Sequence, residues 1–336
     1  MEDLLDNEEM PEQKPKQEPS KESAKPQQRK KSLTQKQLDT MITAAVKWQR
    51  KGPYKADNTR WEQWERNKKY LMCVWDEEFA ENVVFTNYQT KMPTLYFKNP
   101  QITVEPKSPQ FKRDEYGRVL KNDKDQPIIV DNFKVARLFG IKLNYELEEL
   151  GFKKVIKSAI GDNLCPYGIG WIKVGFQTKT VGGHSNTRDR KKSYWIKRPD
   201  PRNIVYDPMA TSMDDCRYIA ELLLMDRSEA EKNGLKIPDD YSGTIPEYLK
   251  DRTSEESKTE KNDHVLVWEF HHLVEDVCYW ALASDDKGSI LKILKDTTQY
   301  DGVHPFEGSC YVPVVLNPTN DDIIGLSDVE PIEKHC

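Results

Sequence analysis

The chain has 336 residues, of which 37% are hydrophobic and 32% are charged, and its mean hydropathy is −0.81. No apolar run approaches the ~18 residues that a bilayer-spanning helix needs, so the composition argues against a membrane protein. The 51 Lys and Arg residues and 56 Asp and Glu residues leave a net charge of −5. This balance argues against a protein that coats nucleic acid over its whole surface, although a local basic face remains possible.

The first residues, MEDLLD, are acidic, and no apolar segment of a secretory signal follows them. We therefore expect the protein to stay in a cytoplasm. The six cysteines contain no C-x-x-C pair, which favours free, buried thiols over a disulfide framework or a zinc site. These cysteines are Cys73, Cys165, Cys216, Cys278, Cys310 and Cys336.

Residues 1–32 differ in composition from the rest of the chain. The first twelve include six acids and no base, and residues 13–32 include seven bases among repeated Pro, Gln and Ser. A segment with so few large apolar side chains cannot bury enough surface to offset its loss of entropy on ordering. We expect a disordered charged tail, either a solvated tail or a tether for a partner or for nucleic acid.

Residues 33–166 are predicted to be mainly helical. Thr34 with Gln37, and Thr59 with Glu62, have the spacing of a capping box, which predicts a helix start at each pair. The first helix should end near residue 52. The second should continue as one long helix until Pro93, with its tryptophans packed in a core rather than exposed as a stacking platform for bases.

A β and loop insert is expected around residues 100–130. Ile102 and Val104 alternate with polar residues beside prolines, which is typical of an edge strand, and residues 111–127 are charged and rich in turn formers. Helical periodicity returns at Phe133. It is interrupted at Gly151 and then resumes, so two consecutive helices are predicted.

Residues 167–325 are predicted to be mostly β, and the whole chain to be α+β, with long N-terminal helices followed by a mostly antiparallel β-rich region. Strands are expected near 171–176, 194–196, 203–206, 217–224, 264–274, 277–283, 289–294 and 312–316. The segment Asp285–Gly288 has the composition of a tight turn. Residues 250–262 should be a mobile loop, and residues 326–336 the start of a truncated helix.

Enzyme motifs are absent from the sequence: it contains no phosphate-binding G-x-x-x-x-G-K-[ST], no G-x-S-x-G and no H-E-x-x-H. Glu269, His271 and His272 are the best metal candidates. Alternation in a strand would place Glu269 and His271 on one face, but no third ligand for this pair is evident, which favours ordinary strand surface or a hydrogen-bonded histidine. A two-metal nuclease could use scattered aspartates, but their sequence contexts favour turns. These aspartates are Asp200, Asp207, Asp214, Asp215, Asp321 and Asp322.

The strongest basic cluster consists of Arg188, Arg190, Lys191 and Lys192, in the expected connection between two strands. Around a groove or ring such cations would attract phosphates in a salt-sensitive, sequence-independent way. The interruption by Asp189 and the lack of a base-reading motif favour the other interpretation, a solvated loop. We predict no catalytic residue, no metal ligand and no cofactor.

Several segments, in order, resemble the portal protein of tailed bacteriophages. They are MPTLYFKNPQITVEP (92–106), AIGDNLCPYGIGWIKVGF (159–176), RPDPRNIVYDPMATSMDDCRYIAE (198–221) and HPFEGSCYVPVVLNPTNDDIIGLSDVEPIE (304–333). Each segment alone is moderately specific, and together they span most of residues 60–336. The β-rich region would then correspond to the outer wing of the family.

The resemblance implies a homo-oligomeric ring, usually of twelve subunits, at one capsid vertex. Double-stranded DNA is packaged and ejected through this ring, which also attaches the tail. The implied partners are copies of the chain, the major capsid and scaffolding proteins, the terminase large subunit, head-completion or adaptor proteins and DNA, with no membrane. The implied location is the virion, or the host cytoplasm during assembly. We expect the stem, clip and crown of the family to lie outside this sequence, and so transfer no tunnel or terminase-contact residue.

Two other functions remain open at this stage. One is a metal-dependent nucleic-acid enzyme that uses the aspartates and histidines. The other is an accessory virion adaptor that uses a portal-like wing for protein contacts alone.

Overall fold

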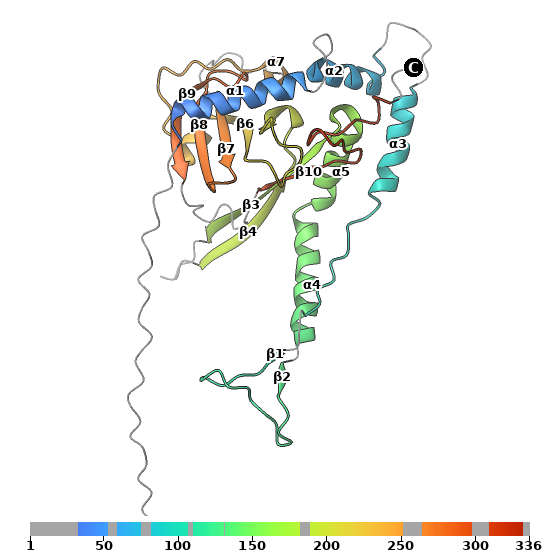
Figure 1. Cartoon of the computed structure of the whole chain (residues 1–336), viewed down its shortest axis with the longest axis vertical. Helices are drawn as coiled ribbons and strands as arrows, with labels where there is room; N and C mark the ends of the chain where they lie inside the picture. Colours follow the sequence, from blue (N-terminus) through green and yellow to red (C-terminus); the bar gives the residue numbers. More distant parts are fainter. Residues whose placement is uncertain are drawn as a thin grey trace, which may run out of the picture. The chain divides into compact units, whose positions relative to one another are not determined.

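A computed structural model describes residues 33–52, 59–74, 82–106, 110–130, 132–181, 189–250, 264–297 and 309–331 (Figure 1). The helices are α1 Gln35–Lys51, α2 Arg60–Leu71, α3 Val83–Leu95, α4 Asn132–Glu149, α5 Phe152–Asp162, α6 Arg227–Lys232 and α7 Glu247–Lys250. The strands are β1 Gln110–Phe111, β2 Ile129–Val130, β3 Gly170–Val181, β4 Asp189–Lys197, β5 Ile204–Tyr206, β6 Tyr218–Asp226, β7 His264–His272, β8 Val277–Ala283, β9 Ile290–Thr297 and β10 Tyr311–Val314. A π-helical turn, Asn163–Tyr167, and a 3-10 turn, Pro201–Asn203, complete the elements. The antiparallel sheets and preceding helices confirm the predicted α+β class.

Helix α1 begins at the predicted capping box. The Thr34 hydroxyl accepts from the Gln37 amide, and the Gln37 side chain accepts from the Thr34 amide at 2.9 Å. Arg50 and Lys51 lie in the last turn, where positive charge interacts favourably with the helix dipole. Gly52 ends the helix with a φ of 65°, a conformation that glycine adopts without strain.

The second predicted helix is two helices, which corrects the expectation of one continuous element. The capping box at Thr59 starts α2 as predicted, but α2 ends at Leu71. Asn82 then caps a new helix, α3, because its side chain accepts from the Phe85 amide at 2.7 Å. Helix α3 also continues two residues past Pro93, so this proline lies inside the last turn instead of ending the helix.

The predicted edge strand around Ile102 and Val104 is not a strand. The segment lies in an irregular conformation along α4, where the Asn144 side chain donates to the Ile102 carbonyl and accepts from the Ile102 amide, both at 2.9 Å. Gly140 faces this segment, and a Cβ atom there would lie 3.5 Å from the Ile102 carbonyl oxygen, which is an ordinary contact distance. Alternation predicted that the backbone of this segment would bond to a neighbouring strand. Its partner is instead a side chain of α4.

Helices α4 and α5 meet at Gly151, as predicted, where the φ of 63° breaks the helical path. Helix α5 then lies against the start of β3. A Cβ atom at Gly170 would come within 1.9 Å of the Ala159 carbonyl oxygen, so only glycine permits this approach.

The strands form two larger antiparallel sheets. One has three strands in the order β10-β3-β4, and the other has five strands in the order β5-β6-β7-β8-β9. Each predicted strand of the β-rich region is found, with ends shifted by several residues. The predicted turn between β8 and β9 is also found, since the Lys287 amide donates to Asp285 and Gly288 has a φ of 102°.

Side chains alternate between the two faces of the five-stranded sheet, and each face packs against a different layer of the structure. Residues on one face pack against α1, whose apolar side is formed by Leu38, Ile42, Ala45 and Val46, and Figure 1 shows this helix crossing strands β6 to β9. Residues on the other face meet the three-stranded sheet. There the Trp171 and Tyr206 rings lie 6.4 Å apart, within one buried cluster.

Residues 326–331 are irregular, with bends and one turn, so the helix predicted to start there is wrong in the part described. Two residues of this segment contact the N-terminal helices instead. Ser327 accepts from Asn67 on α2, and Asp328 pairs with Lys91 on α3.

Helices α6 and α7 were not predicted. The expected tail 1–32 and residues 251–262 of the expected loop lie outside the described residues.

Candidate functional site

Charged side chains from both sheets meet in the core of the β-rich region. Lys173 projects from β3, Glu221 from β6 and Glu269 from β7, and each is at most 7% exposed. The Lys173 ammonium donates to Glu221 Oε2 and to Glu269 Oε2, both at 2.6 Å. The Tyr311 hydroxyl, from β10, donates to Glu221 Oε2 at 2.9 Å. These contacts join the two sheets by hydrogen-bonded ion pairs rather than by apolar packing alone.

The surroundings hold Lys173 and Glu269 in their charged forms and the Tyr311 hydroxyl in its protonated form. Burial by itself lowers the pKa of Lys173, but Glu269 and Glu221 outweigh it and hold this pKa above its ordinary value. Burial by itself raises the pKa of Glu269, but Lys173 and His271 hold it below its ordinary value. Burial raises the pKa of Tyr311 well above its ordinary value, so its hydroxyl remains a donor. A lysine held charged in this way is unsuited to act as a nucleophile or base at neutral pH.

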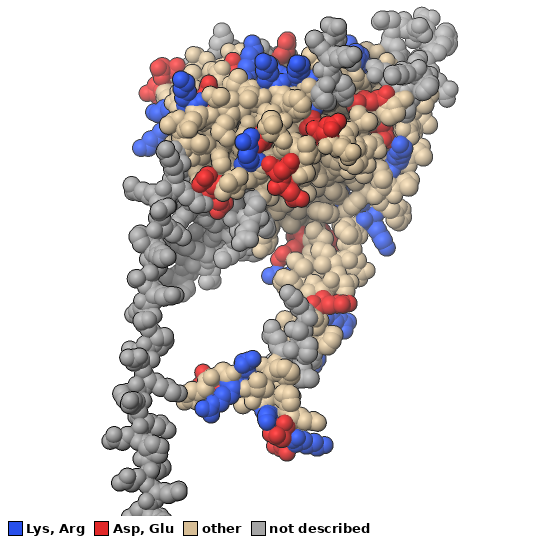
Figure 2. Space-filling view, in the orientation of Figure 1, with Lys and Arg blue, Asp and Glu red and all other residues tan. Residues whose placement is uncertain are grey.

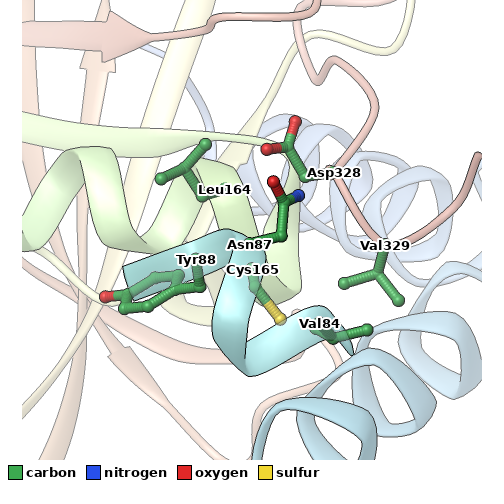
Figure 3. A pocket seen from close by; sticks show the side chains of 7 residues that line it. All are labelled: Val84, Asn87, Tyr88, Leu164, Cys165, Asp328 and Val329. Carbon is green, nitrogen blue, oxygen red and sulfur yellow. The ribbon is translucent and has the colours of Figure 1, made fainter. Parts of the chain in front are cut away.

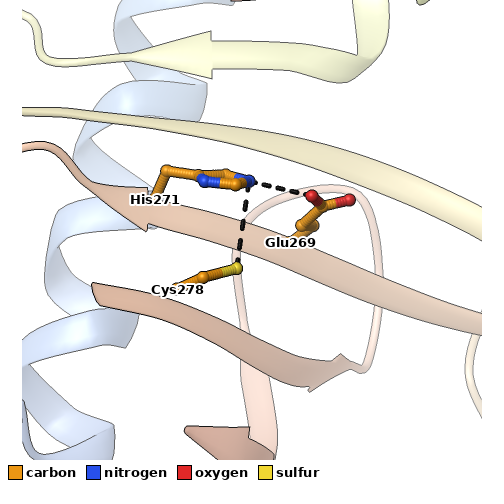
Figure 4. A group of neighbouring side chains, drawn as sticks. All are labelled: Glu269, His271 and Cys278. Atoms are coloured by element: carbon orange, nitrogen blue, oxygen red, sulfur yellow. Dashed lines mark hydrogen bonds and ion pairs between the residues drawn. The ribbon is translucent and has the colours of Figure 1, made fainter. Parts of the chain in front are cut away.

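Glu269 and His271, two of the three predicted metal candidates, do lie together. His271 Nε2 is 2.8 Å from Glu269 Oε1, and Cys278 Sγ is 3.9 Å from the same nitrogen (Figure 4). His272 takes no part, because its Nδ1 accepts from the Glu275 amide at the end of β7. Cys278 thus supplies the third donor that the sequence did not indicate.

Sequence reasoning missed Lys173, Glu221, Cys278 and Tyr311 as members of this cluster. A usable signal existed for Glu221, because a single carboxylate stands among the apolar residues YIAELLL. Charged residues within an apolar strand are rarely buried unless they are paired. The identity of the partners depends on the facing of two sheets that are distant in sequence.

Four of the six candidate nuclease aspartates, Asp200, Asp207, Asp215 and Asp322, each bind partners of their own. Asp200 pairs with Arg202 at 2.9 Å, Asp207 with Arg217, and Asp322 with Arg60. Asp215 accepts from backbone amides of the turn 211–212, which lower its pKa to about 2. Within the described ranges, the one group of three or more potential metal ligands is Glu269, His271 and Cys278. Asp200, Asp207 and Asp215 accept from backbone amides two or three residues away in the chain, as expected of aspartates in turns.

The basic cluster lies differently from the prediction. Arg190, Lys191 and Lys192 belong to β4 itself, opposite Thr180, Lys179 and Thr178 of β3, instead of lying in the connection between strands. The hydrogen-bonded pairing of β3 with β4 extends further along both strands than the alternation of apolar residues indicated. Arg188 lies outside the described residues. On the face of the molecule in Figure 2, Lys and Arg are interspersed with Asp and Glu.

A small pocket lies between α3 and the π-helical turn (Figure 3). It is lined by Val84, Asn87, Tyr88, Leu164, Cys165, Asp328 and Val329. Its space of about 10 Å³ is close to the minimum for one water molecule. Burial raises the pKa of the Cys165 thiol to about 12, so this cysteine is protonated at neutral pH and is a poor nucleophile.

The surface of α4 is unusually apolar. Six large side chains on this helix are between 52% and 74% exposed. They are Phe133, Val135, Leu138, Phe139, Ile141 and Tyr145. Leu138, Ile141 and Tyr145 follow one another at three- and four-residue steps and form one stripe, whereas the opposite side carries the buried Ala136 and Gly140. Exposed apolar surface of this extent is typical of an interaction site.

Neither protein-family models nor curated protein sequences match the chain. Among the described helices, none combines the length and the apolar character needed to span a bilayer.

Proposed function

We propose that the chain is a structural, non-enzymatic subunit of a tailed-bacteriophage portal ring, which forms the channel for double-stranded DNA at the capsid vertex. The proposal rests on the ordered sequence resemblance together with one structural observation, the exposed apolar stripe of α4. A subunit that functions by packing against copies of itself needs such a surface.

The stripe fits a contact between copies energetically. Removing a large aliphatic or aromatic side chain from water contributes roughly 1.5–3 kcal/mol. Leu138, Ile141 and Tyr145 lie on one side of the helix and are each more than half exposed. A neighbouring subunit that covered all three would contribute several kcal/mol to the interface.

The charges of α4 are compatible with a head-to-tail arrangement, although Lys142 and Glu146 also pair within the helix. Its first two-thirds carry Lys134, Arg137 and Lys142, and its last turn region carries Glu146, Glu148 and Glu149. Copies that overlap along this helix with an offset would bring opposite charges together. Repeated head-to-tail contacts close into a ring when the rotation between subunits permits it.

The ionisable groups of the core support an architectural protein more than an enzyme. Lys173, Glu221 and Glu269 are buried and paired with one another, and Asp207 and Asp322 are each bound by an arginine. A substrate would have to displace these partners before it could reach the charged groups. The adaptor alternative shares this architecture and differs in whether the chain itself forms rings.

The test is the assembly state of the purified chain. We expect sedimentation velocity and negative-stain imaging to show closed rings with a central hole at micromolar concentration. The double variant Leu138→Lys/Ile141→Lys should remain monomeric, with the circular dichroism spectrum of the wild type.

The matched control is Val274→Lys/Met209→Lys, because these side chains are also apolar and exposed but lie away from α4. This variant should assemble like the wild type. A wild-type chain that stays monomeric at every concentration would contradict the ring and favour the adaptor. Rings that form equally well in the α4 variant would exclude α4 as the interface.

A further inference from the structure

Three donor atoms of the kind that bind transition metals face one another in the core. Oε1 of Glu269, Nε2 of His271 and Sγ of Cys278 lie within 4.8 Å of one another, and Figure 4 shows the three side chains directed toward a common point. Carboxylate, imidazole and thiolate are all ligands of Zn²⁺, at distances of roughly 2.0–2.3 Å. Small side-chain shifts would bring all three to such distances from one ion.

Strand pairing holds the three donors in place. His271 and Cys278 are directly opposite each other in the β7–β8 ladder, and Glu269 is two residues before His271 on the same face. All three residues are buried. Donors on adjacent strands within a sheet are positioned more rigidly than donors on loops.

Glu269 and Cys278 both lie beside Nε2 of His271. Glu269 Oε1 is 2.8 Å from His271 Nε2, and Cys278 Sγ is 3.9 Å from it. If Nε2 carries a hydrogen that it donates to Glu269, it has no lone pair left to accept from the Cys278 thiol. A cation between the three groups would interact with all of them at once.

The charges of the cluster are consistent with a divalent cation. Lys173 supplies one positive charge, against two negative charges on Glu221 and Glu269. With a neutral His271, a Zn²⁺ ion bound to the Cys278 thiolate adds one net positive charge and makes the cluster neutral. Lys173 donates to Oε2 of Glu269, the oxygen that does not face His271, and such outer contacts orient metal-binding carboxylates.

We infer that Glu269, His271 and Cys278 form a buried Zn²⁺ site that ties β7 to β8. Three protein donors leave a fourth position for a water molecule. The enclosed position indicates a structural ion, and the inference is independent of ring assembly.

The test uses the full chain without a histidine tag and in a Cys73→Ser background, because Cys73 is exposed. After gel filtration, elemental analysis should find about one zinc per chain. Refolding with Zn²⁺ instead of a chelator should raise the unfolding temperature by roughly 5 °C. Cobalt substitution should produce the near-ultraviolet absorption of a cobalt–thiolate bond.

Cys278→Ser should abolish the cobalt–thiolate band and lower the zinc content. Cys216→Ser is the matched control, since Cys216 is equally buried but contacts the Tyr218 carbonyl instead of the cluster. It should retain both signals. The inference would be overturned if the wild type contained substoichiometric zinc and its unfolding temperature did not change with Zn²⁺. This measurement uses the wild type alone, so it does not depend on whether a variant folds. The cluster would then consist of the hydrogen-bonded ion pairs alone, without a metal ion.

Discussion

The ammonium of Lys173 lies 2.6 Å from a carboxylate oxygen of Glu269, and this buried contact joins the three-stranded sheet to the five-stranded sheet. The two residues are 96 positions apart in the sequence. The contact therefore depends on how the two sheets face each other, and it allows a direct measurement of what holds them together.

Replacing Lys173 with Met should destabilise the fold strongly. The substitution leaves two buried carboxylates without their cation, and breaking a buried pair in this way costs about 3–5 kcal/mol. Urea denaturation should show this loss. Lys91→Met is the control, because Lys91 is 47% exposed in its pair with Asp328, and exposed pairs contribute about 1 kcal/mol or less. Similar losses in both variants would contradict a structural role for the buried pair.

The stability of the protein should depend on the protonation of Asp162. Burial raises the pKa of this carboxyl to about 6, although Arg198 opposes the shift. The folded state therefore retains a proton that the unfolded chain loses near its ordinary pKa of about 4. The contribution of Asp162 is fully present below pH 4 and falls, by roughly 3 kcal/mol, as the pH rises to 6.

Asp162→Asn isolates this effect from the other titrating groups. The free energy of unfolding of the wild type minus that of the variant should decrease between pH 4 and pH 6 and then level off. Urea denaturation at intervals across this range measures the difference. A difference that stays constant or increases with pH would show that Asp162 is ionised in the folded protein throughout.

Two glycines should respond in opposite directions to the same change. Gly170→Ala places a methyl group where the Ala159 carbonyl lies, so α5 and β3 must separate. We expect a loss of at least about 1–3 kcal/mol, the cost of other overpacking changes. Gly140→Ala meets nothing closer than 3.5 Å in the middle of α4 and should stabilise the protein by about 0.5–1 kcal/mol. Thermal unfolding checks both, and a stable Gly170→Ala variant would refute the close approach.

The basic cluster should protect a sheet edge rather than bind DNA. Strand β4 is at the edge of its sheet, and charged residues at such edges discourage pairing with other chains. Alanine at Arg188, Arg190, Lys191 and Lys192 should therefore increase light scattering while leaving the salt dependence of DNA binding unchanged.

The control for this variant removes the same amount of charge from exposed helix positions, at Lys36, Lys47, Lys153 and Lys154. It should scatter light no more than the wild type. A shallower salt dependence in the basic-cluster variant alone would instead show that these cations contact phosphates.

Local interactions explain which features could be predicted from the sequence. The capping boxes at Thr34 and Thr59, the break at Gly151 and the turn at Asp285–Gly288 each depend on residues within four positions of one another. Their signals are complete in a short stretch of chain. The split between α2 and α3 was missed because apolar spacing continues across it.

The sequence by itself determined the α+β class, the starts of the first two helices and the approximate positions of the strands of the β-rich region along the chain, because backbone caps, turns and alternation act over a few residues. Only the tertiary structure decided that Glu269 and His271 are joined by Cys278, that Lys173 pairs with both glutamates, and that the apolar side of α4 is exposed. These relationships depend on which faces of distant elements meet. Periodicity shows that an element has an apolar face, but the surface that this face contacts is set by the packing of the remaining chain and of neighbouring molecules.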